Sequence, residues 1–144
     1  METGEKVKKI IIIDDSRHCD YIEKDVKEYV LPLAPLTYKA YTFEEAKEKY
    51  ESNPDVEIMI VDISIDRLDL RTDTGNSYLG LDLIEEIRKK NSTVHLIAYT
   101  AYDDNEEIKL KQRLHAANAY YINKYSMTDS TKELLEKVYK FLIE

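Results

Sequence analysis

Several common features are scarce or missing in this sequence, and each absence narrows what the chain can be. Its 144 residues contain one cysteine, Cys19, so no internal disulfide can form, and this cysteine usage fits a reducing compartment. No apolar run is long enough for a signal sequence or a membrane span. No basic patch offsets the formal net charge of -8, which would repel nucleic-acid phosphates. We therefore expect a cytoplasmic protein without membrane insertion and without direct nucleic-acid binding.

Linkers, low-complexity segments and internal repeats are also missing. The charged residues, 35% of the chain, are interspersed rather than gathered in blocks, which argues against a disordered tail. A chain of 144 residues can bury roughly 70% of its unfolded surface, enough for a core without disulfides. We therefore expect residues 1–144 to form one domain that binds protein partners or a small charged ligand.

Strands and helices are expected to alternate along the whole chain. Residues 56–61 are mostly apolar without two-residue alternation, a pattern typical of a parallel strand covered by helices on both faces. Four more strands are expected at about residues 7–13, 36–41, 94–99 and 119–123. Helices are expected at about residues 16–30, 43–52, 79–90 and 103–114, and from about residue 129. We therefore predict a doubly wound α/β domain with a five-stranded parallel sheet, and the order 2-1-3-4-5 places the less apolar second strand at an edge.

Local residues predict the ends and the buried faces of these helices. Asp15 or Ser16 can cap the first helix, and Pro32 helps to end it. Thr42 and Glu45 match a capping box at the second helix. The apolar residues at helical spacing are Cys19, Ile22, Val26 and Val30, then Leu79, Leu83, Ile84 and Ile87, then Ile108, Leu110 and Leu114, and finally Leu134, Leu135, Val138, Phe141 and Leu142.

The segment between Asp62 and Gly80 has no regular pattern. A loop longer than about 12 to 15 residues without structure of its own is uncommon, and it is usually functional or mobile. A short hairpin through residues 63–70 would give this segment some structure of its own.

Polar side chains follow four of the five predicted strands. Asp14 and Asp15 follow the first strand, Asp62 the third, Thr100 the fourth and Lys124 the fifth. In open α/β sheets, ligands bind beyond the carboxyl ends of the strands, in the crevice where the strand order reverses. That crevice lies between the first and third strands in the predicted order, so the three carboxylates would meet there.

Three carboxylates in one crevice repel each other, so a cation is needed to neutralise them. Magnesium is the natural candidate, because it prefers oxygen ligands and is commonly held by one or two carboxylates together with phosphate oxygens. An aspartate beside such a cation can attack phosphorus and form an aspartyl phosphate. Lys124 could share the charge of the phosphoryl oxygens, and Thr100 could donate a hydrogen bond to one of them.

This set, Asp14, Asp15, Asp62, Thr100 and Lys124, resembles the receiver domain of two-component response regulators. The resemblance covers essentially the whole chain and implies the flavodoxin-like receiver fold. It implies that Asp62 is the phosphoacceptor and also contacts the metal. It further implies that Asp15 binds magnesium directly and that Asp14 acts mainly through bound water.

The resemblance assigns roles to four further positions. The backbone carbonyl of Ser64, two residues past the phosphoacceptor, would complete the magnesium site. Thr100 and Lys124 would bind the phosphoryl group. Tyr121, three residues before the lysine, matches the switch aromatic of the family, which responds together with Thr100.

The function implied by the resemblance is that of a stand-alone receiver. A histidine kinase or a phosphotransfer protein would supply the phosphoryl group, and the chain itself would catalyse its magnesium-dependent phosphorylation and dephosphorylation without conventional turnover. Phosphorylation would change the affinity for a downstream protein partner. The usual output surface of the family combines the fourth and fifth helices with the fifth strand. The sequence leaves the oligomeric state open, a homodimer included.

Two positions depart from the family pattern. Tyr125 stands where a proline usually follows the lysine. The segment from Asp62 to Gly80 replaces a short loop, and its length suggests a lid, a partner-specific surface or altered access to Asp62.

Each of these residues also has a purely structural interpretation. Asp14 and Asp15 could merely cap the first helix, and Thr100 could cap the fourth. Lys124 could be a solvated charge, and Tyr121 could be a core residue. The histidines His18, His95 and His115 show no ligand spacing and are expected to be structural or exposed, and Cys19 is expected to be buried and inert.

Two other functions compete with the phosphoacceptor hypothesis. A pseudo-receiver would use the same fold as a binding module that needs no phosphorylation, although such a module has no need for clustered carboxylates. A phosphatase of the haloacid dehalogenase type also uses an aspartate at a strand end. That family has an Asp-x-Asp motif after its first strand, which residues 14–16 do not match.

Overall fold

The computed structural model describes residues 7–64, 79–101, 104–124 and 129–144. Strands and α-helices alternate through this part of the chain, and a short 3-10 helix, η1 (Leu31–Leu33), follows the first α-helix. The elements are β1 (Lys9–Ile13), α1 (Ser16–Tyr29), β2 (Leu36–Ala40), α2 (Phe43–Ser52), β3 (Ile58–Val61), α3 (Leu79–Lys90), β4 (His95–Thr100), α4 (Asp104–Ala116), β5 (Ala119–Asn123) and α5 (Asp129–Ile143).

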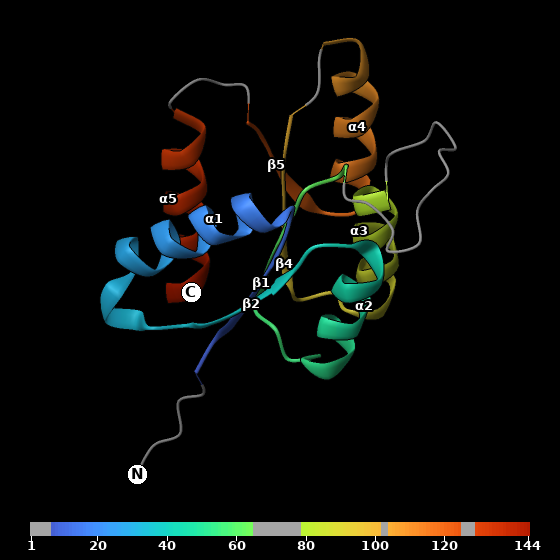
Figure 1. Cartoon of the computed structure of the whole chain (residues 1–144). Coiled ribbons are helices and arrows are strands. Elements are labelled where there is room, and N and C mark those ends of the chain that lie inside the picture. The colour runs from blue at the N-terminus through green and yellow to red at the C-terminus, as the bar shows by residue number, and fades with distance from the viewer. Residues whose placement is uncertain (1–6, 65–78, 102–103, 125–128) are drawn as a thin grey trace.

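The strands form one parallel sheet in the order β2-β1-β3-β4-β5. Helices α1 and α5 cover one face of this sheet, and α2, α3 and α4 cover the other, as Figure 1 shows. Both the predicted fold class and the predicted strand order are confirmed. The less apolar second strand lies at an edge of the sheet, as its composition suggested.

The two faces of the sheet explain why the strands are apolar without alternation. On β1, Ile10 and Ile12 pack with the residues of α1 and α5, whereas Ile11 and Ile13 pack with those of α2, α3 and α4. All four side chains are fully buried. Since each of these four positions faces a helix layer, each of them is apolar.

Side-chain caps fix where the first two helices begin. The side chain of Asp15 accepts a hydrogen bond from the backbone N–H of His18, which makes Asp15 the N-cap of α1. Thr42 caps α2 and accepts from the N–H of Glu45 at 3.1 Å. The carboxylate of Glu45 reaches the N–H of Tyr41 at 2.7 Å, so the predicted capping box closes one residue before the cap.

The buried faces of the helices follow the predicted spacing with one error. Ile108 is 66% exposed, whereas Leu110 and Leu114 are buried. Two residues span about 200° on a helix, so Ile108 lies on the side opposite Leu110, and assigning both to the core was wrong. The predicted hairpin lies at residues 63–70, most of which are outside the described residues. No helix in the described ranges is both long enough and apolar enough to span a membrane.

Gly80, in the first turn of α3, lies directly against the chain that leaves β3. Its N–H donates to the carbonyl oxygen of Ile63 at 2.8 Å. A Cβ at this position would lie 2.4 Å from the carbonyl oxygen of Asp62 and 2.5 Å from the Cα of Ile63. Only a residue without a side chain allows this approach, so the position of the backbone at Asp62 depends on Gly80.

We expect Gly80→Ala to lower the free energy of unfolding by about 1 to 3 kcal/mol, the usual cost of overpacking. The sign is informative, because Gly→Ala inside a helix ordinarily stabilises by roughly 0.5 to 1 kcal/mol. Chemical denaturation measures the difference. Lys89→Ala, at an exposed position of the same helix, serves as the control and should stay within about 0.5 kcal/mol of the wild type. A Gly80→Ala protein as stable as the control would contradict the close approach.

Candidate functional site

The carboxyl ends of the strands hold the candidate residues through the backbone. The N–H of Asp14 donates to the carbonyl of Ala40 at 3.1 Å, and the N–H of Asp62 donates to that of Ile13 at 2.8 Å. On the other side of the sheet, the N–H of Lys124 donates to the carbonyl of Thr100 at 2.8 Å. These bonds continue the parallel ladder past the strand ends, so they fix where each side chain begins.

Asp14 and Lys124 form the closest ion pair at this edge of the sheet. The Nζ atom of Lys124 lies 2.6 Å from Oδ2 of Asp14 and 3.6 Å from Oδ2 of Asp62. Asp14 is only 2% exposed and the Lys124 side chain 16%. One ammonium group therefore lies between two carboxylates from β1 and β3, as the order of the strands predicted. We call Asp14, Asp15, Asp62 and Lys124 the acidic site.

Asp62 is held by two donors at one of its oxygens. The hydroxyl of Thr100 donates to Oδ1 at 2.8 Å, and the backbone N–H of Ser64 donates to the same oxygen at 3.0 Å. Thr100 is fully buried, whereas the Asp62 side chain is 19% exposed. The structure thus brings Thr100 and Asp62 into direct contact. The roles of Thr100 and of the Ser64 carbonyl stay predictions.

Asp15 is the N-cap of α1, one of the two roles that its position suggested. Its Oδ1 accepts from the backbone N–H of His18 at 2.8 Å, and its Oδ2 lies 2.8 Å from Nδ1 of the same histidine. Burial works against ionisation of Asp15, but the hydrogen bonds from His18 outweigh it and lower the pKa of this carboxyl. A capping role does not exclude a metal role, because Asp15 remains largely solvent-accessible.

His18 is the residue that sequence reasoning missed. Its imidazole lies beside both Asp14 and Asp15, whereas we expected it to have no role in a site. The signal was present, because His18 follows these aspartates by four and three residues, a spacing that brings side chains together at the start of a helix. The spacing among the three histidines alone does not carry this signal.

The charges of the acidic site are not fully balanced. Burial and the repulsion of Asp62 raise the pKa of Asp14 to about 6, although Lys124 acts in the opposite direction. Burial also disfavours the charged form of Lys124, but attraction to Asp62 and Asp14 outweighs it and raises the pKa of the lysine. Perturbed groups of this kind gather at functional sites.

The donor set fits a divalent cation of the magnesium kind. A carboxylate whose pKa is raised by burial and by a second carboxylate, as that of Asp14 is, gains from a nearby positive charge. Oxygen atoms of Asp14 and Asp15 lie within 4.8 Å of each other, close enough to bind one ion. The residues present therefore suit an ion bound largely by oxygen.

Tyr121 and Cys19 lie outside the acidic site. The hydroxyl of Tyr121 donates to Oε2 of Glu107 on α4 at 3.0 Å, and its ring packs partly against the core. The amide of Asn123 donates to the same Glu107 oxygen at 3.0 Å. The switch role of Tyr121 stays a prediction. Cys19 is fully buried, and burial raises the pKa of its thiol to about 12, in agreement with the expected inert residue.

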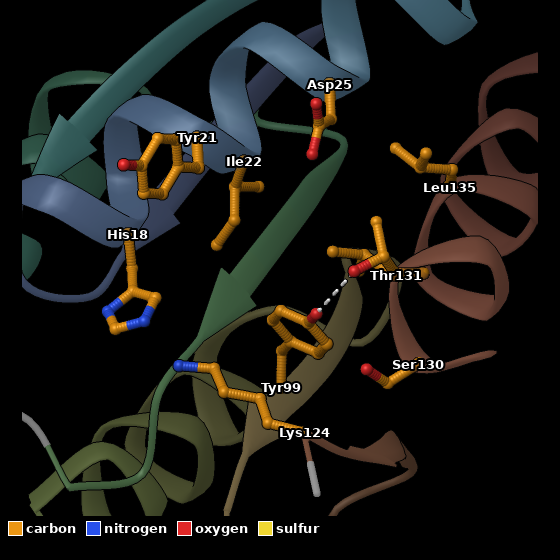
Figure 2. Close-up of a pocket in the computed structure, with 10 residues that line it drawn as sticks. His18, Tyr21, Ile22, Asp25, Tyr99, Lys124, Ser130, Thr131 and Leu135 are labelled. Carbon is orange, nitrogen blue, oxygen red and sulfur yellow. Dashed lines mark hydrogen bonds between the residues drawn. The ribbon is translucent and has the colours of Figure 1, made fainter. Parts of the chain in front are cut away.

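A cavity of about 410 Å³ adjoins the acidic site between α1 and α5. Figure 2 shows His18 and Lys124 at one end of this cavity and Asp25 and Leu135 toward the other. The hydroxyls of Tyr99 and Thr131 lie 3.4 Å apart within it. The ammonium of Lys124 is therefore shared between the cavity and the acidic site.

We expect Asp14→Asn to stabilise the metal-free protein above pH 6. The folded-state pKa of Asp14 is raised from 3.8 to about 6, so folding becomes less favourable as this carboxyl ionises across that range. The gain in unfolding free energy should be about 1 to 3 kcal/mol at pH 7, should be much smaller at about pH 4 and should vanish below about pH 3, where Asp14 is protonated in both states.

Denaturation in a chelating buffer at several pH values measures this gain. Asp25→Asn, which neutralises a neighbouring carboxylate on α1, should change the unfolding free energy by no more than about 0.5 kcal/mol at each pH. A stabilisation by Asp14→Asn that is the same at pH 4 and pH 7 would contradict the raised pKa.

Comparison with known proteins adds the fold family. No protein-family model and no curated protein matches the sequence. A CheY-like response regulator receiver domain protein from Methanospirillum hungatei JF-1 is 24% identical with a TM-score of 0.68, over 96% of this chain and 95% of that one. A response regulator from Thermotoga maritima is 21% identical with a TM-score of 0.65, over 96% and 100%. A DNA-binding response regulator of the LuxR family from Staphylococcus aureus is 17% identical with a TM-score of 0.70, over 94% and 99%. At these identities the likeness concerns architecture, and the chain has the fold of response regulator receiver domains.

Proposed function

We propose that this chain is a receiver that accepts a phosphoryl group on Asp62 in the presence of magnesium. The observation that carries the proposal is the convergence of strand-end side chains, with Lys124 at 2.6 Å from Asp14 and Thr100 at 2.8 Å from Asp62. A stable strand end does not need two carboxylates, a buried hydroxyl and an ammonium in contact. In phosphoryl transfer each of them has a use, as nucleophile, metal ligand or partner of the phosphoryl oxygens.

Asp62 is the nucleophile in this proposal. A carboxylate oxygen attacks the phosphorus of the donor, a P–O bond to Asp62 forms, and the bond from phosphorus to the donor's leaving group breaks. Oδ1 already accepts two hydrogen bonds, from Thr100 and Ser64. Oδ2, which faces Lys124 at 3.6 Å, is therefore the better candidate for the attacking atom.

Thr100 and Lys124 act on the transferred group. The hydroxyl of Thr100 now donates to Asp62, so it can turn to a phosphoryl oxygen bound to the same residue without moving far. Lys124 lies within reach of both carboxylates, and its ammonium can exchange Asp14 for a phosphoryl oxygen. Both changes alter contacts across β4 and β5, where the Thr100 carbonyl is bonded to the Lys124 N–H.

Asp14, Asp15, Asp62 and the carbonyl of Ser64 would hold magnesium in this proposal. When bound, the ion supplies positive charge to the phosphoryl oxygens and lowers their repulsion of the attacking carboxylate. Asp14 would contribute a buried negative charge to the magnesium site, since it is only 2% exposed. One oxygen of Asp15 keeps the cap of α1, and the other, which now lies 2.8 Å from Nδ1 of His18, would contact the ion.

The partners of this proposal follow from its chemistry and from the fold. A histidine kinase or a phosphotransfer protein would be the donor, and a downstream protein would recognise the phosphorylated form. Tyr121 would report the change, because Glu107 binds Tyr121 and Asn123 together, and Asn123 precedes Lys124. The chain would act as one receiver unit.

The test is the intact mass of the protein after incubation with acetyl phosphate and magnesium. We expect one added phosphoryl group in the wild type, and none without magnesium or in Asp62→Asn. Asp25→Asn, the matched control, should gain the group as the wild type does. Treatment with hydroxylamine should remove it, because an acyl phosphate is labile to this nucleophile.

Addition of the group to Asp62→Asn to the same extent would show that another residue is the acceptor. If neither protein gained mass with acetyl phosphate or with a phosphorylated phosphotransfer domain, the phosphoacceptor proposal would be wrong. A binding module independent of phosphorylation would then be the better description of the chain.

A further inference from the structure

The imidazole of His18 lies next to both carboxylates that follow β1. Its Nδ1 atom is 2.8 Å from Oδ2 of Asp15 and 3.7 Å from Oδ1 of Asp14. One ligand atom from each of these residues lies within 4.8 Å of the other two. With small side-chain adjustments, a single ion could therefore bind one nitrogen and two oxygens here.

The backbone of α1 holds this arrangement in place. Asp15 caps the helix and His18 occupies its third position, so their separation is set by the first turn. Asp14 is fixed by the bond from its N–H to the carbonyl of Ala40. The Asp14 side chain is 2% exposed and that of His18 49%, so an ion bound between them would be anchored in the protein and still open to solvent.

The group forms without Asp62. The oxygen Oδ1 of Asp62 accepts hydrogen bonds from Thr100 and Ser64, and its Oδ2 faces Lys124. An ion at Asp14, Asp15 and His18 would thus be displaced toward α1 from one shared by Asp14, Asp15 and Asp62. The two positions use the same pair of carboxylates, so they exclude each other.

The nitrogen ligand decides which ions prefer the position near α1. Magnesium strongly prefers oxygen ligands in octahedral geometry and gains little from an imidazole. Zinc, nickel and copper bind imidazole well, and mixed histidine and carboxylate sites suit them. A histidine beside two aspartates therefore shifts the preference of the site toward these late first-row divalent ions.

We propose that His18 is a metal ligand that, together with Asp14 and Asp15, binds a divalent ion of the zinc class. Such an ion would occupy the carboxylates that magnesium requires and would inhibit transfer to Asp62. The inference rests on the proposed function for this inhibition, whereas the binding of zinc through His18 can be measured without it.

The other two histidines provide internal controls. His95 stacks on Phe141 with ring centroids 3.9 Å apart, and its Nε2 lies 3.5 Å from Glu144, at the opposite end of the strands. His115 is exposed in the last turn of α4. Neither belongs to the mixed group at Asp14 and Asp15.

The experiment is a titration of the full chain with Zn²⁺ and, separately, with Mg²⁺, by calorimetry and by ¹⁵N NMR of the imidazole nitrogens. We expect the wild type to bind one Zn²⁺ with a large shift of Nδ1 of His18. His18→Gln should weaken Zn²⁺ binding by about tenfold or more and change Mg²⁺ binding by less than about twofold. His115→Gln should match the wild type. Glutamine suits the third position of a capped helix, so His18→Gln should keep α1 intact. His18→Ala provides a second substitution at the same position.

The outcomes separate a ligand from a merely structural histidine. Equal Zn²⁺ affinity in the wild type and in both His18 variants would overturn the proposal. An equal loss of Zn²⁺ and Mg²⁺ affinity would overturn it as well, because His18 would then only orient Asp15.

Phosphorylation by acetyl phosphate separates this inference from the proposed function. With Mg²⁺ alone, His18→Gln should gain a phosphoryl group as the wild type does. Added Zn²⁺ should inhibit phosphorylation of the wild type, and about tenfold more Zn²⁺ should be needed for the same inhibition of the variant. Zinc binding through His18 in a protein that never accepts phosphate would support zinc binding and refute the phosphoacceptor. If both proteins accepted the phosphoryl group and Zn²⁺ inhibited both equally, the result would support the phosphoacceptor and refute zinc binding through His18.

Discussion

The contact between Lys124 and Asp14 is the interaction on which the functional end of the molecule depends. It joins the end of β5 to the end of β1, two strands separated by β3 and β4 in the sheet. Because Asp62 also lies 3.6 Å from the same ammonium, one cation holds together the ends of three strands. A buried ion pair of this kind contributes little net stability compared with apolar packing, so stability alone does not explain its presence here.

The acidic site carries more negative than positive charge around that contact. Asp14 and Asp62 face one ammonium, and the pKa of Asp14 is raised to about 6 by burial and by the second carboxylate. The lysine therefore neutralises only part of the negative charge. A second cation, or the redistribution of charge that follows phosphorylation, would complete the neutralisation. This unneutralised negative charge favours the binding of a cation at the acidic site.

The fold was predictable because its pattern is repeated and local. Apolar strands without alternation, separated by helical periodicity, lead to a parallel sheet, and the less apolar residues 36–41 indicated the edge strand. The convergence of Asp14, Asp62, Thr100 and Lys124 followed from the strand order alone, since polar residues at the ends of parallel strands must share an edge.

What could not be predicted depends on side-chain directions. The sequence gives no indication that Glu107 binds two residues of β5, because these contacts depend on rotamers and on how α4 lies on the sheet. The spacing of Asp15 and His18 brings the two residues together, but it does not say that the carboxylate turns to the imidazole ring. The prediction for Ile108 was wrong because it rested on the apolar side chain alone and ignored on which face of the helix the residue lies. In the sequence, Gly80 only marks the end of a long irregular segment. Its role comes from a close approach to the backbone at Asp62, which the sequence does not indicate.

In the proposed function, Asp62 together with magnesium forms a pocket for a tetrahedral phosphoryl group. Beryllofluoride mimics that group on a carboxylate, so ¹⁹F NMR of the protein with beryllofluoride and Mg²⁺ tests the claim most directly. We expect bound ¹⁹F resonances in the wild type that need Mg²⁺, disappear in Asp62→Asn and persist in Asp25→Asn. Absence of bound resonances in the folded wild type at saturating Mg²⁺, or their survival in Asp62→Asn, would contradict it.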